Sequence, residues 1–211
     1  MSELLSFHDL VVGYGGTRVA GPFTSALKQG QAVEVHGRNG SGKSTFLKTV
    51  AGILPPLGGR IERMQKLRMG YVPQAATVSL QIPCTAEEFV MLGVHGAGAS
   101  SGSVVDASSL FHSLHLEEVR RTPVTHLSGG QRQRLLLIRA LATKPDLLIF
   151  DEGFSSADDQ SVKLIGLALS EYCRRESGTL LYVTHQPALI PDIDSGRFLI
   201  DGGPVEAGAG H

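Results

Sequence analysis

Residues 31–51 have the sequence QAVEVHGRNGSGKSTFLKTVA. The stretch begins as a short strand, Gln31–His36, passes through a glycine-rich turn and continues into a helix over Ser44–Ala51. From Gly37 to Ser44 it matches G-x-x-x-x-G-K-[ST], a loop whose glycines let backbone N–H groups surround a phosphate at the positive end of a helix. Chance produces the bare pattern in on the order of one chain in a hundred of this length. The stretch therefore predicts a nucleotide-binding loop.

Two side chains in this loop have specific roles in the prediction. Lys43 can reach the β- and γ-phosphates, and the Ser44 hydroxyl can bind Mg²⁺. The predicted ATP-binding residues of the loop are Gly37, Arg38, Asn39, Gly40, Ser41, Gly42, Lys43, Ser44 and Thr45.

A second motif supplies acidic residues. The apolar run Leu147–Phe150 is followed directly by Asp151 and Glu152. A strand of this kind brings a carboxylate to the carboxyl edge of an open α/β sheet, where ligands bind. We expect Asp151 to hold Mg²⁺ through water and Glu152 to polarise the attacking water. Without the phosphate loop, the same residues would only indicate a strand that leads into a surface turn.

The order of the elements predicts an α/β fold. Apolar strands separated by helical stretches favour a mainly parallel sheet that is covered on both faces. The first forty residues suggest antiparallel strands, which form a β subdomain. Residues 75–143 are expected to form an inserted helical subdomain, with helices over Thr85–Leu92 and Asp106–Val119 and a flexible loop over Gly93–Ser103. One domain would then span residues 1–211, with 1–74 and 144–211 as the catalytic core.

Composition excludes several classes of protein. The chain has 211 residues, of which 42% are hydrophobic and 18% charged, so it is not disordered. A net charge of -1 shows no basic excess for binding nucleic acid. Cys84 and Cys173 are expected to be free thiols. The start of the chain does not have the pattern of a signal peptide, and no apolar run is long enough to span a bilayer.

The segment Leu127–Gln131 has the sequence Leu-Ser-Gly-Gly-Gln. A serine and two glycines at the start of a helix direct a hydroxyl, backbone N–H groups and the helix dipole toward an anion. With this motif, the chain resembles the nucleotide-binding subunits of ATP-binding-cassette (ABC) transporters. The resemblance covers nearly the whole chain. It implies a P-loop NTPase of the ABC-cassette type, in which Ser128, Gly129, Gly130 and Gln131 contact the ATP of a second copy.

The resemblance assigns roles to four further residues. Tyr14 would stack on adenine, Gln74 would sense Mg²⁺ and water, and His185 would contact the γ-phosphate. Asp158, in the Ser-Ala-Asp segment at 156–158, would reach the partner's ATP site. Gln74 also begins the region that contacts the membrane subunits. Catalysis would therefore depend on Glu152, His185 and Gln74, and the metal on Ser44, Gln74 and Asp151.

Some residues depart from the family pattern. Gly153 stands where proline is usual after the catalytic glutamate, and Ala157 replaces the usual leucine. Glu34 and His36 are polar residues in a strand that should be buried and apolar, and the sequence does not indicate what they would pair with. Gly153 and Ala157 suggest slow or partner-dependent hydrolysis, and they keep a non-hydrolysing, ATP-gated clamp as an alternative.

The implied activity is transport-coupled ATP hydrolysis with ATP and Mg²⁺ as cofactors. The expected partners are separate membrane permease subunits, a second cassette in an ATP-sandwich dimer and, for an importer, a substrate-binding protein; nucleic acid is not expected. The chain would lie at the cytoplasmic face of the inner membrane. The stretch from Tyr71 to Gly93 resembles that of zinc and manganese importers, and haem or another small molecule is the alternative cargo. A soluble ABC ATPase acting on nucleic acid or ribosomes is the alternative class.

Overall fold

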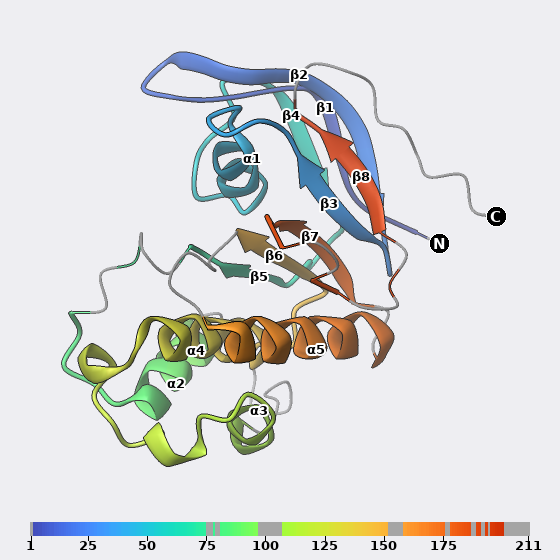
Figure 1. The fold of residues 1–211 in the computed structure, drawn as a ribbon. Helices are drawn as coiled ribbons and strands as arrows, with labels where there is room; N and C mark the ends of the chain where they lie inside the picture. Colours follow the sequence, from blue (N-terminus) through green and yellow to red (C-terminus); the bar gives the residue numbers. More distant parts are fainter. Residues whose placement is uncertain are drawn as a thin grey trace.

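The computed structural model describes residues 2–74, 78, 81–96, 107–151, 158–175, 178–186, 189–190, 193 and 195–200. Two β-sheets and a set of helices make up this part of the chain (Figure 1). The first sheet is antiparallel, with strand order β2-β1-β4, and consists of β1 (Glu3–Tyr14), β2 (Thr17–Lys28) and β4 (Gly58–Arg63). The second is parallel, with strand order β5-β6-β7-β3-β8, and consists of β3 (Ala32–His36), β5 (Met69–Val72), β6 (Leu147–Asp151), β7 (Thr179–Val183) and β8 (Ser195–Leu199).

The parallel sheet brings the functional segments to one edge. All residues of β6 and β7 are buried, as expected for central strands covered on both faces. The antiparallel sheet and α1 (Lys43–Val50) lie on one side, and α4 (Gly129–Leu141) and α5 (Asp159–Arg175) lie on the other (Figure 1). Because β6, β7 and β3 are neighbours, the residues that follow their carboxyl ends lie close together. This confirms the predicted parallel core and antiparallel β subdomain.

Four phenylalanines anchor α1 beneath the antiparallel sheet. Phe46 of α1 stacks on Phe198 of β8 with ring centroids 4.8 Å apart. Phe7 and Phe23, from β1 and β2, meet Phe46 edge-on at 5.4 and 5.5 Å. Each aromatic pair of this kind contributes about 1 kcal/mol beyond the burial of its area. The cluster therefore fixes the helix that follows the glycine-rich loop.

The helical segment extends the core on the other face of the sheet. It comprises α2 (Ala86–Gly96), α3 (Ala107–Ser113), α4 and two short 3₁₀ turns, η2 (Glu117–Val119) and η3 (Val124–His126). Phe89 of α2, Phe111 of α3 and Leu135 of α4 are buried in one apolar cluster with sheet residues such as Phe150. The boundaries proposed for a separate helical subdomain stay a prediction.

Two predicted helix boundaries in this segment are wrong. Helix α2 continues to Gly96, so residues 93–96 are not loop; most of the predicted loop, residues 97–103, lies outside the described residues. Helix α3 ends at Ser113 instead of Val119, because His115 has a left-handed backbone with φ 51°. Arg134 Nη1 donates to the carbonyl oxygen of Leu114 at 2.8 Å, which gives the end of this helix a partner.

The polar residues of β3 pair with each other. His36 Nε2 lies 3.2 Å from Glu34 Oε2, and the two side chains are 34% and 22% exposed. The Tyr182 hydroxyl donates to Ser195 Oγ at 3.0 Å and lies 3.5 Å from Glu34. Both side chains of the Glu34–His36 pair are partly exposed, so each retains some access to water. The expectation that β3 is buried and apolar on both faces is therefore wrong at these two residues.

Among the described residues, no helix is both long enough and apolar enough to cross a membrane.

Candidate functional site

The glycine-rich loop joins β3 to α1 and leaves the start of the helix open. Gly40 and Gly42 have φ values of 82° and 100°, which side chains other than glycine rarely adopt. A Cβ atom on Gly42 would also lie 2.6 Å from Val19 Cγ1. Gly42 is the N-cap of α1, and no side chain accepts a hydrogen bond from the first turn. The backbone N–H groups of this turn are therefore available to an anion.

Lys43 folds back over the loop that precedes it. Its Nζ atom donates to the carbonyl oxygens of Gly37 at 2.7 Å and Arg38 at 2.9 Å. The ammonium group thus lies against the backbone of the glycine-rich loop, where the phosphates are expected. Transfer of these hydrogen bonds to phosphate oxygens would replace neutral acceptors with charged ones, which bind an ammonium more strongly.

Two hydroxyl groups hold the carboxylate of Asp151. Ser44 Oγ, from the first turn of α1, donates to Asp151 Oδ1 at 2.8 Å. The Tyr71 hydroxyl, from β5, donates to Asp151 Oδ2 at 2.9 Å. Asp151 is only 3% exposed. Burial of the Tyr71 hydroxyl, together with the negative charge of Asp151, raises the pKa of Tyr71 well above the usual range. Tyr71 therefore remains a proton donor to this carboxylate at any physiological pH.

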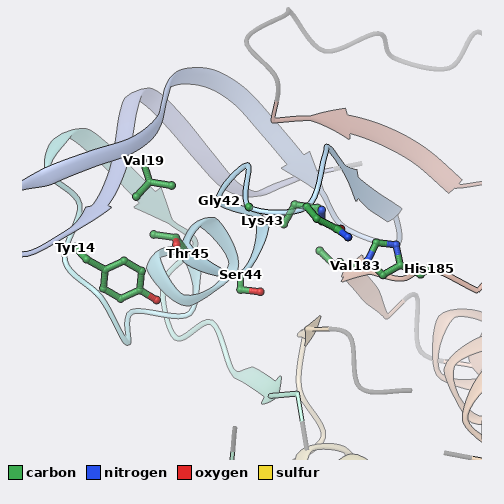
Figure 2. Close-up of a pocket in the computed structure, with 10 residues that line it drawn as sticks. Tyr14, Val19, Gly42, Lys43, Ser44, Thr45, Val183 and His185 are labelled. Atoms are coloured by element: carbon green, nitrogen blue, oxygen red, sulfur yellow. The ribbon is translucent and has the colours of Figure 1, made fainter. Parts of the chain in front are cut away.

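A cavity of about 440 Å³ lies over the loop (Figure 2). Figure 2 shows Tyr14 and Val19 on one side of the start of α1, and Lys43 beside His185 on the other. His185 follows the end of β7 and is exposed. The cavity is lined by Tyr14, Val19, Asn39, Gly40, Gly42, Lys43, Ser44, Thr45, Val183 and His185. Most of the residues predicted to bind ATP within one copy thus surround one cavity.

The Ser128–Gln131 segment begins a different helix, and its first and last residues hydrogen-bond to each other. Ser128 is the N-cap of α4, and its Oγ accepts from the backbone N–H of Gln131 at 3.2 Å. Gln131 Oε1 accepts in return from the N–H of Ser128 at 2.8 Å, which completes a capping box. Among the described residues, none of this segment lines the cavity over the phosphate loop.

Asp158 lies beside this segment in its own chain. Its Oδ1 accepts from the N–H of Ser161 at 2.6 Å at the start of α5, and this backbone hydrogen bond lowers the pKa of Asp158. A Cβ atom on Gly130 would lie 2.5 Å from Ser161 Oγ and 3.4 Å from Asp158 Oδ2. The amino ends of α4 and α5 are therefore in close contact, which the sequence did not indicate.

For the other predicted site residues outside the loop, the structure gives only the position of Gln74. Gln74 follows β5 by two residues and is partly buried. Glu152, Gly153 and Ala157 lie outside the described residues, so their roles stay predictions. Sequence reasoning missed the Tyr71 hydroxyl, which it used only as a landmark before Gln74. One signal could have found it: β5 and β6 both lead into predicted site residues, and if they are neighbouring parallel strands, a long side chain near the end of β5 can reach Asp151 at the end of β6.

A second cavity, of about 310 Å³, lies between β5, α2 and α4. Tyr71 and Pro73 line it on the sheet side, and Gly93 and Arg139 line it on the helical side. The Arg139 guanidinium stacks over Phe89 at 4.5 Å, and burial lowers the pKa of Arg139. The guanidinium of Arg139 thus lines this cavity, together with Pro73, the residue before Gln74.

Comparison with known proteins identifies the family. The sequence model of the ABC transporter family matches residues 22–155. The zinc import ATP-binding protein ZnuC of Yersinia enterocolitica is 35% identical over 191 residues, covering 90% of this chain and 73% of that protein. ZnuC of Ruegeria sp. is 34% identical over 184 residues, covering 87% of this chain and 72% of that protein. The chain belongs to the ABC transporter family.

Solved structures agree with this assignment. An ATP-binding subunit of an ABC transporter matches with a TM-score of 0.79 and 26% identity, over 97% of this chain and 88% of that one. A dimeric ATP-binding cassette, MJ0796 bound to ADP and phosphate, matches in fold with a TM-score of 0.81 and 21% identity, over 99% of this chain and all of that one. The chain is an ATP-binding, ATP-hydrolysing subunit of an ABC transporter.

Proposed function

We propose that this chain drives zinc import by hydrolysing Mg²⁺–ATP in a dimer that is bound to separate membrane subunits. The observation that supports zinc as the cargo is the identity of 34–35% to zinc import ATP-binding proteins over about nine-tenths of the chain. The predicted resemblance of the stretch after Tyr71 to zinc and manganese importers agrees with it.

The donors at the phosphate loop suit Mg²⁺. A serine hydroxyl and a carboxylate oxygen 2.8 Å apart are hard oxygen ligands of the kind that Mg²⁺ prefers, and they lie where the β- and γ-phosphates are expected. Ser44 would bind the ion directly, and Asp151 and Gln74 would hold it through water. The bound ion would neutralise charge that develops on the phosphates.

Hydrolysis needs a residue that orients water. Asp151 ends β6 beside the phosphate loop, and we assign this role to Glu152, the next residue in the sequence. His185 lines the same cavity as Lys43, so its imidazole can contact the terminal phosphate. Tyr14, nearly half exposed at the other end of the cavity, would stack on the adenine.

The nucleotide site is completed by a second copy. Ser128 and Gln131 are separated from the cavity of their own chain, yet they present a helix N-terminus to an anion. A head-to-tail pair would place the Ser128–Gln131 segment and Asp158 of one copy over the ATP of the other. Two ATP molecules would then hold the pair together, and hydrolysis would release it.

The membrane subunits would bind at the cavity between β5, α2 and α4. Tyr71, whose hydroxyl donates to Asp151, and Pro73, the residue before Gln74, both line this cavity, so a partner that binds there would be sensitive to the state of the nucleotide site. The chain would thereby be a peripheral subunit at the cytoplasmic face of the inner membrane. A substrate-binding protein would deliver zinc from the other side.

The cargo can be tested by uptake of radioactive metals. Cells that lack this chain should lose high-affinity uptake of ⁶⁵Zn and retain uptake of ⁵⁴Mn. The parent chain should restore zinc uptake, whereas Lys43→Ala should not. Unchanged zinc uptake together with a loss of manganese or haem uptake would contradict zinc as the cargo and would leave the ATPase assignment intact.

A further inference from the structure

Tyr71 connects the strand before Gln74 to the carboxylate at the end of the next strand. In the parallel pairing of β5 with β6, Tyr71 lies opposite Ile149, two residues before Asp151. The long side chain spans this offset, and its hydroxyl donates to Asp151 Oδ2 at 2.9 Å. Neither the ABC motifs nor the comparisons give this hydroxyl a role.

The two oxygens of Asp151 have donors from different elements. Ser44 Oγ, on the nucleotide side, donates to Oδ1, and Tyr71, on the side of β5, donates to Oδ2. A carboxylate that is only 3% exposed requires such donors, since a buried oxygen without a partner is costly. The two hydrogen bonds together fix the plane of the carboxylate.

These two donors are not equivalent once a metal ion binds. Ser44 is also the hydroxyl that is expected to bind the ion, so the position of its Oγ, and with it the hydrogen bond to Oδ1, would then be set partly by the ion. Tyr71 has no such second role and can keep Oδ2 in place. Oδ1 then stays directed toward the phosphate loop, where it can accept a hydrogen bond from water on the ion.

We propose that Tyr71 is a positioning residue for the metal, because its hydroxyl holds the Asp151 carboxylate in the orientation that the Mg²⁺–nucleotide complex requires. This inference rests on the proposed function of Ser44 and Asp151. Tyr71 contacts neither nucleotide nor metal in this account and acts only through Asp151.

The test separates the hydroxyl from the ring. Tyr71→Phe removes the hydroxyl and retains the aromatic packing of β5, and Tyr71→Leu removes both. Tyr182→Phe is the matched control: it removes the hydroxyl of a strand tyrosine whose partners are Ser195 and Glu34 rather than Asp151. Binding of Mn²⁺ in the presence of ADP is measured from the electron paramagnetic resonance signal of the free ion, and binding of ADP is measured separately in EDTA.

Both Tyr71 variants should weaken Mn²⁺ binding by about tenfold, the scale found when a group that orients a metal ligand is lost. Their ADP affinity in EDTA should stay within a factor of about two of the parent, as should Mn²⁺ binding by Tyr182→Phe. Unchanged Mn²⁺ binding in Tyr71→Phe, or an equal loss in Tyr182→Phe, would overturn the role of Tyr71. If the parent protein itself failed to bind ADP, the proposed nucleotide site would be wrong as well.

Discussion

The phosphate loop and the Ser128–Gln131 segment both begin a helix, yet they differ in how their polar groups are paired. At α1 the N-cap is glycine, and no side chain caps the first turn. At α4 the N-cap serine and Gln131 satisfy each other in a capping box. No side chain of the N-cap pairs the first N–H groups of α1, so these are open to an external anion, whereas at α4 the capping box pairs the N–H groups of Ser128 and Gln131 and leaves those of Gly129 and Gly130 for a ligand.

In the proposed function this difference matters, because one chain would contain two parts of an ATP site that do not join each other. The uncapped loop, with Lys43 and the Ser44–Asp151 pair beside it, is the part that we propose binds nucleotide in a single copy. The capped segment packs against the start of α5 at Gly130, and none of it lines that cavity among the described residues. It can serve as a preformed surface that closes over the nucleotide of a partner.

The largest expected effect comes from removing the cation of the loop. Lys43→Ala should weaken ATP binding by roughly a hundredfold, because hydrogen bonds to a charged group contribute about 1.5–3 kcal/mol. Lys48→Ala, in the last turn of the same helix, is the matched control and should bind ATP normally. Isothermal titration with ATP provides the measurement. Affinity within a factor of three of the parent would contradict the role of Lys43.

Gly130→Ala should disturb the Ser128–Gln131 segment and leave the phosphate loop unchanged. The new Cβ atom would lie 2.5 Å from Ser161 Oγ, so either the buried Ser161 side chain must rotate or the amino ends of α4 and α5 must move apart. We expect a loss of about 1–3 kcal/mol in the free energy of unfolding, measured by urea denaturation, and a marked loss of hydrolysis. ATP binding by the single copy should be unchanged.

A second substitution tests the cause of that loss. In the double variant with Ser161→Ala, the nearest remaining atom would be the Cβ of residue 161, at 3.3 Å. Much of the stability should therefore return. If Ser161→Ala restored nothing, the contact between the two helix ends would not be the cause.

The smallest effect on stability is expected for a substitution outside both the phosphate loop and the Ser128–Gln131 segment. Arg68 donates to both carboxylate oxygens of Asp146, which joins the amino ends of β5 and β6 at the edge of the sheet away from the site. These hydrogen bonds lower the pKa of Asp146. Asp146→Asn should reduce stability at pH 7 by about 0.5–1 kcal/mol, since the pair is partly exposed to solvent.

The pH dependence of this effect has a definite sign. Because the folded protein lowers the pKa of Asp146, the stabilisation is complete above its ordinary pKa and is lost as the pH falls through the folded value. Urea denaturation of parent and variant should therefore differ at pH 7 and converge near the acid limit. A difference that grew on acidification would show that Arg68 does not stabilise the charged form.

The sequence predicted the parts of the site whose chemistry depends on short motifs. The strand, loop and helix around Gly37–Ser44 and the strand end at Asp151 were predicted because local spacing alone determines them. The partner of Asp151 on β5 was missed, since strand order within a sheet is a property of the whole chain. The end of α3 was also missed: the left-handed backbone of His115 was not indicated by the motifs, and the Leu114 carbonyl oxygen is paired by Arg134, twenty residues further along.

The central claim, that each ATP lies between the loop of one copy and the Ser128 segment of another, can be tested by mixing two inactive variants. Lys43→Ala retains a normal Ser128 segment, and Ser128→Arg retains a normal loop. Each alone should fail to hydrolyse ATP, although Ser128→Arg should still bind it. Thr125→Arg, an exposed change three residues away, controls for the added charge.

An equal mixture of the two variants should regain hydrolysis, because half of the randomly formed pairs contain one intact composite site. The account predicts about a quarter of the parental rate for such a two-fold pair. A mixture no more active than its separate components, or parental hydrolysis by Ser128→Arg alone, would contradict the shared site.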